Sequence, residues 1–131
     1  MLRRAAATAP PRAGRIDRHD RRGAMTAAGM LAISEERSTD RYVVAVAGEL
    51  DIATAAPVEQ ALQRAEATDA RSVIFDLSRL DFMDASGVAL LVRANARSRA
   101  DSNRLIVMRP PRHVMRVLVL SAIAHTLPFA D

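Results

Sequence analysis

The chain has 131 residues, enough for one domain of ordinary size. Only 3% of the residues are aromatic, so few side chains can stack on nucleic-acid bases. Cysteine and lysine are both missing from the sequence, which excludes disulfides, thiolate zinc sites, cysteine nucleophiles and lysine Schiff bases. The net charge of +4 comes from the first 24 residues, which have seven arginines and two aspartates, while the rest of the chain has a net charge of −1. We therefore expect no direct binding to nucleic acid, because the folded part lacks a basic surface.

The first 29 residues have the composition of a disordered leader. Arginine, alanine, proline and glycine predominate, and the longest apolar run before Met25 is too short for a secretory signal. Two alternatives stay open, namely a basic arm that contacts nucleic acid or membrane, or a true translation start at Met25 or Met30. No run of the sequence approaches the roughly 20 apolar residues of a membrane span. We expect a cytoplasmic protein that does not enter the membrane, with a single domain over residues 30–131.

From Leu31 onward, strand and helix patterns alternate. Runs of aliphatic and β-branched residues predict strands at 31–37, 42–47, 73–77, 105–108 and 126–129. The apolar run at 42–47 indicates a strand covered on both faces. Helical spacing of apolar residues predicts three helices, at 55–67, at about 85–99, and after Pro110-Pro111, and Thr54 is a candidate N-cap of the first. Long crossovers between the later strands predict an α/β fold of order β-β-α-β-α-β-α-β with a mixed, mostly parallel sheet.

The segment around Ser86 is the most informative for function. We expect Asp84 to cap the second helix, which places Ser86 in its first turn, where free N–H groups and the helix dipole favour an anion. Gly87 allows another backbone to come close beside it. The same residues are also typical of an ordinary helix start with a solvated serine.

The helix that follows Ser86 has two distinct stripes. At 100° per residue, we predict that one stripe faces outward and consists of Ser86, Leu90, Arg93 and Arg97. The opposite stripe, which we predict to face the sheet, contains Val88, Leu91 and Val92, with Asn95 at its centre. A row of serine, leucine and arginine suits a protein contact better than a small-molecule pocket.

Three segments resemble the STAS domains, and within them the bacterial anti-sigma-factor antagonists: GELDIATA at 48–55, VIFDLSRLDFMDASGVALLV at 73–92, and the strand LIVM with its following helix at 105–122. The resemblance covers about residues 31–129. It implies that a serine kinase, which is also the anti-sigma factor, phosphorylates Ser86, the serine directly before the glycine. It further implies that the unphosphorylated form sequesters the anti-sigma factor and frees sigma, that a phosphatase resets the system, and that Asp51 and Asp84 lie near the serine.

One departure from the family concerns the C-terminus. Family members usually continue into a C-terminal helix, whereas this sequence ends two residues after Phe129. We therefore expect a fold that lacks this helix, and a monomer or weak homodimer.

Two other functions stay open at this stage. The chain could be a STAS subunit that regulates a transporter or a stress-sensing complex, in which Ser86 need not be phosphorylated. It could also be a small hydrolase or ligand-binding enzyme that uses Asp84 and Ser86, but G-x-S-x-G is missing from the sequence and Ser86 has no evident base. The three histidines lack metal-ligand spacing. We therefore predict no enzymatic activity, no catalytic residue, no metal and no cofactor.

Overall fold

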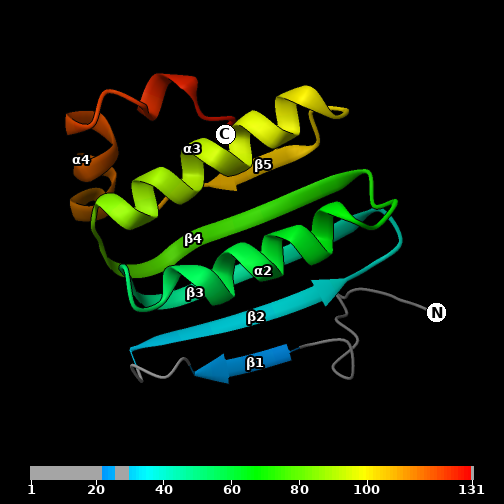
Figure 1. Cartoon of the computed structure of the whole chain (residues 1–131), viewed down its shortest axis with the longest axis horizontal. Helices are drawn as coiled ribbons and strands as arrows, with labels where there is room; N and C mark the ends of the chain where they lie inside the picture. Colours follow the sequence, from blue (N-terminus) through cyan, green and yellow to red (C-terminus); the bar gives the residue numbers. More distant parts are fainter. Residues whose placement is uncertain (1–21, 26–29, 131) are drawn as a thin grey trace.

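The computed structural model describes residues 22–25 and 30–130, and within them one five-stranded sheet (Figure 1). Its strands lie side by side in chain order: β1 (Arg22–Met25), β2 (Leu31–Arg37), β3 (Arg41–Leu50), β4 (Ser72–Met83) and β5 (Leu105–Met108). The pairs β1–β2 and β2–β3 are antiparallel, while β3–β4 and β4–β5 are parallel. The sheet is therefore mixed, as predicted, but not mostly parallel. The predicted leader over residues 1–29 lies outside the described residues except at β1, a strand that the sequence pattern did not indicate.

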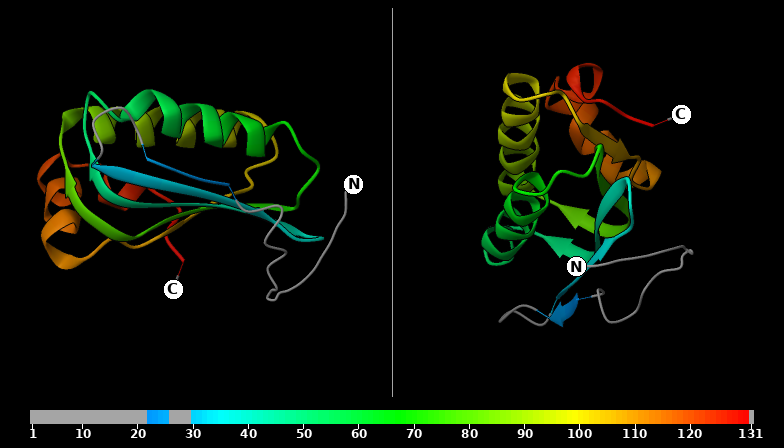
Figure 2. Two further views of the ribbon diagram at one scale, coloured as in Figure 1. Left: turned by 90° about the horizontal axis from the view of Figure 1, so that it is seen from below. Right: turned by 90° about the vertical axis from the view of Figure 1, so that its right-hand side faces the viewer.

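Two helices cover one face of this sheet and lie next to each other (Figures 1 and 2). Helix α2 (Ala55–Glu66) connects β3 to β4, and helix α3 (Ala85–Ala100) connects β4 to β5. Such crossovers return the chain to the same edge, which is why these strand pairs are parallel. Helix α4 (Arg112–Leu120) packs against β4 and is followed by a short 3₁₀ turn, η2 (Ala124–Thr126). From β2 to α4 the order β-β-α-β-α-β-α agrees with the prediction.

The hydrophobic core lies between the sheet and the helices. In β3, Val44 and Val46 are buried, whereas Val43, Ala45 and Ala47 are only partly buried. This alternation is typical of a sheet with one packed face, so the prediction that the strand is covered on both faces is wrong. The largest fully buried side chains come from every layer: Leu31, Val44, Val46, Leu50, Val58, Leu62, Phe75, Leu77, Leu80, Leu90, Leu91 and Leu118.

Strand β4 continues six residues beyond its predicted end at Leu77. It stays paired with β3 through two irregularities of register, and Gly48 lies at one of them with φ of +113°. An added Cβ at Gly48 would collide with the carbonyl oxygen of Met30, which accepts a hydrogen bond from the Glu49 N–H at 2.8 Å. The extra length brings β4 to the same sheet edge where β3 ends, and this edge holds the segment around Ser86.

The predicted last strand at 126–129 is not formed. Residues 124–126 are the turn η2, and Phe129 makes a single parallel bridge with Val107. Pro128 has no N–H to donate, which prevents a regular ladder. Its carbonyl accepts a hydrogen bond from the Val107 N–H at 2.9 Å, and the Ala130 N–H donates to the Val107 carbonyl at 2.9 Å. These two bonds hold the segment beside β5 without making it a strand.

Candidate functional site

Ser86 lies where β4 passes into α3. The Ser86 N–H donates a hydrogen bond to Asp84 Oδ1 at 2.8 Å, and the N–H groups of Gly87 and Val88 donate to the Asp84 carbonyl at 3.0 and 3.2 Å. Asp84 is therefore the N-cap of α3, as the sequence predicted. Ser86 is partly buried, and its hydroxyl makes no hydrogen bond within the part of the chain that the structure describes. The cap thus uses the backbone of Ser86 and leaves its hydroxyl uncommitted.

Gly87 holds the first turn of α3 close to the ends of two strands. A Cβ at this position would lie 2.5 Å from Met83 Cγ and 3.1 Å from Leu50 Cγ. Met83 and Leu50 are buried and are paired in the register of β4 and β3. The glycine is therefore required by a close approach of the helix to the sheet, but the nearest atoms belong to the side chains of Met83 and Leu50, whereas the sequence predicted another backbone there.

Asp51 and Asp84 follow neighbouring strand ends. Because Leu50 and Met83 are register partners, the two aspartates start from the same sheet edge, and the Asp84 N–H donates to the Leu50 carbonyl at 3.2 Å. The Asp51 carboxylate accepts hydrogen bonds from the N–H groups of Ala53 and Thr54 at 3.0 and 3.2 Å. Asp51 is therefore at the edge that holds Ser86, with its carboxylate directed to its own turn.

Thr54 occupies the N-cap position of α2 but does not cap it with its side chain. Its buried hydroxyl donates to the Glu49 carbonyl at 2.8 Å and accepts from the Asp51 N–H at 2.9 Å. The sequence correctly predicted that Thr54 precedes α2, but the predicted capping hydrogen bond from its side chain is not formed. Thr54 instead fixes the turn that contains Asp51.

The buried side of α3 differs from the predicted one. Leu90, which we predicted to face outward, is fully buried, and Val92, which we predicted to face the sheet, is 45% exposed. The buried residues of α3 are Gly87, Leu90, Leu91, Ala94 and Asn95. The prediction centred the buried side on the bulkiest apolar residues, whereas Gly87 and Ala94 lie at its centre, between Leu90 and Leu91, because the helix packs closely there. Leu90 is therefore unavailable for contact with a partner, while Arg93 is exposed.

Asn95 is buried on the inward side, as predicted. Its side-chain amide donates to the Thr126 carbonyl at 3.1 Å. Asn95 therefore satisfies the backbone of η2 and connects α3 to the C-terminal segment.

A groove of about 600 Å³ separates α3 from α2 and has Ser86 in its wall. On α3 it is lined by Ser86, Ala89, Arg93 and Arg97; on the α2 side it is lined by Ile52, Ala55, Ala56, Glu59, Gln60 and Gln63. The structure thus places Ser86 and Arg93 in one groove, and excludes Leu90 from it.

Two arginines and two glutamates join the helices along this groove. Arg93 donates to Glu59 Oε1 from Nη2 and Nε at 3.0 and 3.3 Å, and Arg97 Nη1 lies 2.6 Å from Glu59 Oε2. Arg97 also donates to both carboxylate oxygens of Glu66 at 2.9 and 3.0 Å. These contacts, with Glu66 first and Glu59 second, raise the pKa of Arg97.

The two glutamates of this cluster were not predicted from the sequence. Glu59 and Glu66 are seven residues apart on α2, and Arg93 and Arg97 are four apart on α3. Matching stripes of opposite charge on consecutive helices were a usable signal, because both spacings keep residues on one helix face.

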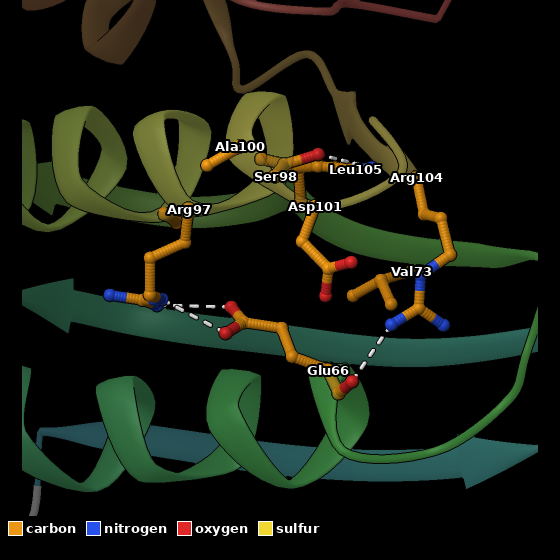
Figure 3. Close-up of a pocket in the computed structure, with 9 residues that line it drawn as sticks. Glu66, Val73, Arg97, Ser98, Ala100, Asp101, Arg104 and Leu105 are labelled. Atoms are coloured by element: carbon orange, nitrogen blue, oxygen red, sulfur yellow. Dashed lines mark hydrogen bonds and ion pairs between the residues drawn. The ribbon is translucent and has the colours of Figure 1, made fainter.

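A second hollow, of about 320 Å³, lies at the opposite ends of α2 and α3 (Figure 3). The Arg104 guanidinium donates to the carbonyls of Glu66 and Thr68 at 2.8 and 3.0 Å, and also to that of Ala70. These acceptors lie at and beyond the C-terminal end of α2, where helix carbonyls lack intrahelical partners. Arg97 points to the Glu66 carboxylate from the other side. Arg97 and Arg104 therefore connect α3 and the segment before β5 to the C-terminal end of α2.

Across residues 22–25 and 30–130, no group of three or more His, Cys, Asp or Glu side chains is arranged to bind a metal ion. His113 Nε2 lies 2.7 Å from the Asp81 carbonyl, a contact that joins α4 to β4. Among the helices in the described ranges, none has the length and apolar character needed to cross a membrane.

Residues 33–128 match the family model described as "Mlab, STAS domain". The chain belongs to the STAS domain family. Over 90 residues, this STAS domain is 27% identical to the anti-sigma-B factor antagonist of Listeria monocytogenes, which corresponds to 69% of this chain and 79% of the relative. The same figures apply to the anti-sigma-B factor antagonist of Listeria innocua.

Solved structures have the same fold as this STAS domain. An anti-sigma factor antagonist from Mycobacterium paratuberculosis matches with a TM-score of 0.69 at 23% identity, over 81% of this chain and 90% of that one. The anti-sigma factor antagonist SpoIIAA in its unphosphorylated form matches with a TM-score of 0.58 at 26% identity, over 76% of this chain and 88% of that one. A phosphorylated form of SpoIIAA from Bacillus matches with a TM-score of 0.57 at the same identity, over 76% of this chain and 91% of that one.

Proposed function

We propose that this STAS domain is an anti-sigma-factor antagonist that binds an anti-sigma factor when Ser86 is unphosphorylated. The observation that carries the proposal is the Ser86 hydroxyl, which lies in the first turn of α3, lines an open groove and has no hydrogen-bond partner among the described residues. The names of the relatives support the functional class, since they are anti-sigma factor antagonists. Asp51, Asp84, Gly87 and Arg93 belong to the proposed phosphorylation and binding site, whereas Leu90 is buried and is left out of it.

The modification transfers one phosphoryl group to Ser86. The partner kinase holds ATP, Ser86 Oγ attacks the γ-phosphorus, the bond to the ADP oxygen breaks, and the hydroxyl proton passes to a base of the kinase. Phosphoserine then carries about −1.5 to −2 charges at pH 7, next to the N-cap carboxylate of Asp84 and at the sheet edge from which Asp51 also starts. A partner that presses against this edge loses affinity through repulsion and desolvation, and about 1.4 kcal/mol is a tenfold loss. A phosphatase removes the group and restores binding.

Phosphorylation is tested by incubating the protein with ATP and a candidate partner serine kinase of the GHKL class, and then mapping phosphate by mass spectrometry. We expect phosphate on Ser86 and none in Ser86→Ala. Ser78→Ala is the matched control, because Ser78 is exposed on β4 away from the groove, and it must still be phosphorylated. If the partner binds the protein but Ser86 carries no phosphate after incubation with ATP, the result would favour a STAS subunit of a transporter or stress-sensing complex instead.

The effect of charge is tested by calorimetry with the same partner. Ser86→Ala should bind as the unmodified protein does, and Ser86→Asp should bind at least about tenfold more weakly. Ser86→Asn has nearly the size of aspartate without its charge and should keep most of the affinity. Equal weakening by Asn and Asp would mean that size, not charge, controls binding, and would contradict the proposal.

A further inference from the structure

The two arginines in the groove between α2 and α3 differ in how many carboxylates they contact. Glu59 contacts two arginines, because Arg93 bonds Oε1 and Arg97 lies 2.6 Å from Oε2. The Arg97 contact is an ion pair, and Glu59 Oε2 accepts no hydrogen bond in the structure. Arg97 also donates hydrogen bonds to Glu66, whereas Arg93 is bonded to Glu59. Arg93 is therefore the cation whose removal leaves both glutamates paired.

We infer that Arg93 leaves Glu59 and binds the phosphate when Ser86 is phosphorylated, so that the groove contains its own phosphate-binding arginine. This inference rests on the proposed phosphorylation of Ser86. Ser86 and Arg93 line the same groove and are seven residues apart, which is two turns and about 10 Å along the helix axis. Helical side chains lean toward the N-terminus, so Arg93 leans toward Ser86. Ala89 lies between them on the same wall, and its short side chain does not block the path.

Glu59 keeps an ion-pair partner when Arg93 is released. The Arg93 side chain is 55% exposed and can reorient through solvent, whereas the Glu59 side chain is only 15% exposed and needs a cation beside it. Arg97 supplies that cation, 2.6 Å from Glu59 Oε2. The phosphate offers a stronger partner, because a guanidinium can bind two phosphate oxygens of a dianion at once. Arg97 stays with Glu59 and Glu66, so the helices remain joined.

Recruitment of Arg93 extends the signal beyond Ser86. The positive charge of the guanidinium offsets part of the negative charge of the phosphate. Glu59 Oε1 loses the two hydrogen bonds that it accepts from Arg93. A partner in contact with the groove therefore meets a changed surface on α2 as well as on α3.

The test uses phosphoserine incorporated at position 86 during translation, so that no kinase is required. The second pKa of the phosphate, ordinarily about 6, is followed by ³¹P NMR during a pH titration. A nearby cation favours the dianion and lowers this pKa, so Arg93→Ala should raise it by about half a unit. Arg93→Lys keeps the charge and should restore most of the difference. Arg99→Ala is the matched control, since Arg99 is exposed on the same helix about 20 Å along the axis from Ser86. This substitution should leave the pKa of the phosphate unchanged.

A second readout follows the arginine itself. With ¹⁵N-labelled arginine, the Nε–H signal of Arg93 should move between the unphosphorylated and phosphorylated proteins, while that of Arg99 should not. Identical phosphate titrations in the protein with phosphoserine and its Arg93→Ala variant would overturn the inference, as would an equal shift in Arg99→Ala. Failure of a kinase to modify Ser86 would instead contradict the proposed function, and the two failures are thereby distinguishable.

Discussion

Substitution of Gly87 by alanine tests how closely α3 approaches the sheet. A helical glycine normally destabilises, and in a helix interior alanine is favoured by about 1 kcal/mol. Local helix propensity therefore predicts that Gly87→Ala stabilises the protein. The structure predicts the opposite, because the added Cβ would lie 2.5 Å from Met83 Cγ and 3.1 Å from Leu50 Cγ.

The magnitude follows from the surroundings of Gly87. Met83 is 2% exposed and Leu50 is fully buried, so neither side chain can move into solvent. Overpacking of such a core costs about 1–3 kcal/mol, and the helix-propensity gain offsets part of it. We expect a net loss of up to about 2 kcal/mol, which lowers the Tm of a domain of this size by up to about 10 °C.

Chemical denaturation of the wild type and Gly87→Ala measures this loss, and a double-mutant cycle identifies its cause. Met83→Ala alone should cost about 2–5 kcal/mol, because it leaves a cavity. In the Gly87→Ala background the cost should be smaller by about 1 kcal/mol, since the new methyl group occupies the vacated space. A more stable Gly87→Ala, or strictly additive substitutions, would refute the close approach of α3 to the sheet.

Other predictions concern the buried side of α3, its N-cap and the ion pair between Arg37 and Asp69. Leu90→Ala should destabilise the protein by about 2–5 kcal/mol and Val92→Ala by less than about 1 kcal/mol, as measured by denaturation; the reverse order would restore the predicted orientation of the helix. Asp84→Ala should cost about 1 kcal/mol through loss of the cap, and an unchanged Tm would show that the Ser86 N–H has another acceptor. A hydrogen bond from Arg37 lowers the pKa of Asp69, so Asp69→Asn should reduce the free energy of unfolding above about pH 4. This difference should disappear as the pH falls through the lowered pKa, and urea titrations that differ equally at pH 2 and pH 7 would contradict it.

Local sequence patterns were sufficient to predict the order of the elements from β2 to α4, the capping role of Asp84 and the position of Ser86 in the first turn of α3. These features depend on residues a few positions apart, because hydrophobic periodicity and cap chemistry act over one or two turns. The sequence predicted a close approach at Gly87 as well, but of another backbone, whereas the side chains of Met83 and Leu50 make the contact.

Local sequence could not predict which side of α3 is buried. Leu90 lies inward and Val92 outward because the packing of α3 against the sheet depends on the fit of small and large side chains across both elements. The pairing of Arg93 with Glu59, 34 residues earlier, depends in the same way on how two helices lie side by side.

The packing of strand β2 also depends on distant residues. Strand β2 includes a buried glutamate, Glu35, which a local pattern would leave in solvent. Arg64, 29 residues later on α2, donates to both of its carboxylate oxygens at 3.0 and 2.6 Å, and Tyr42 donates to Oε1 at 2.7 Å. A buried charge is tolerated only when such partners reach it, and the hydrogen bond with Glu35 in turn raises the pKa of Arg64. The chain segments that supply these partners come together only in the folded protein.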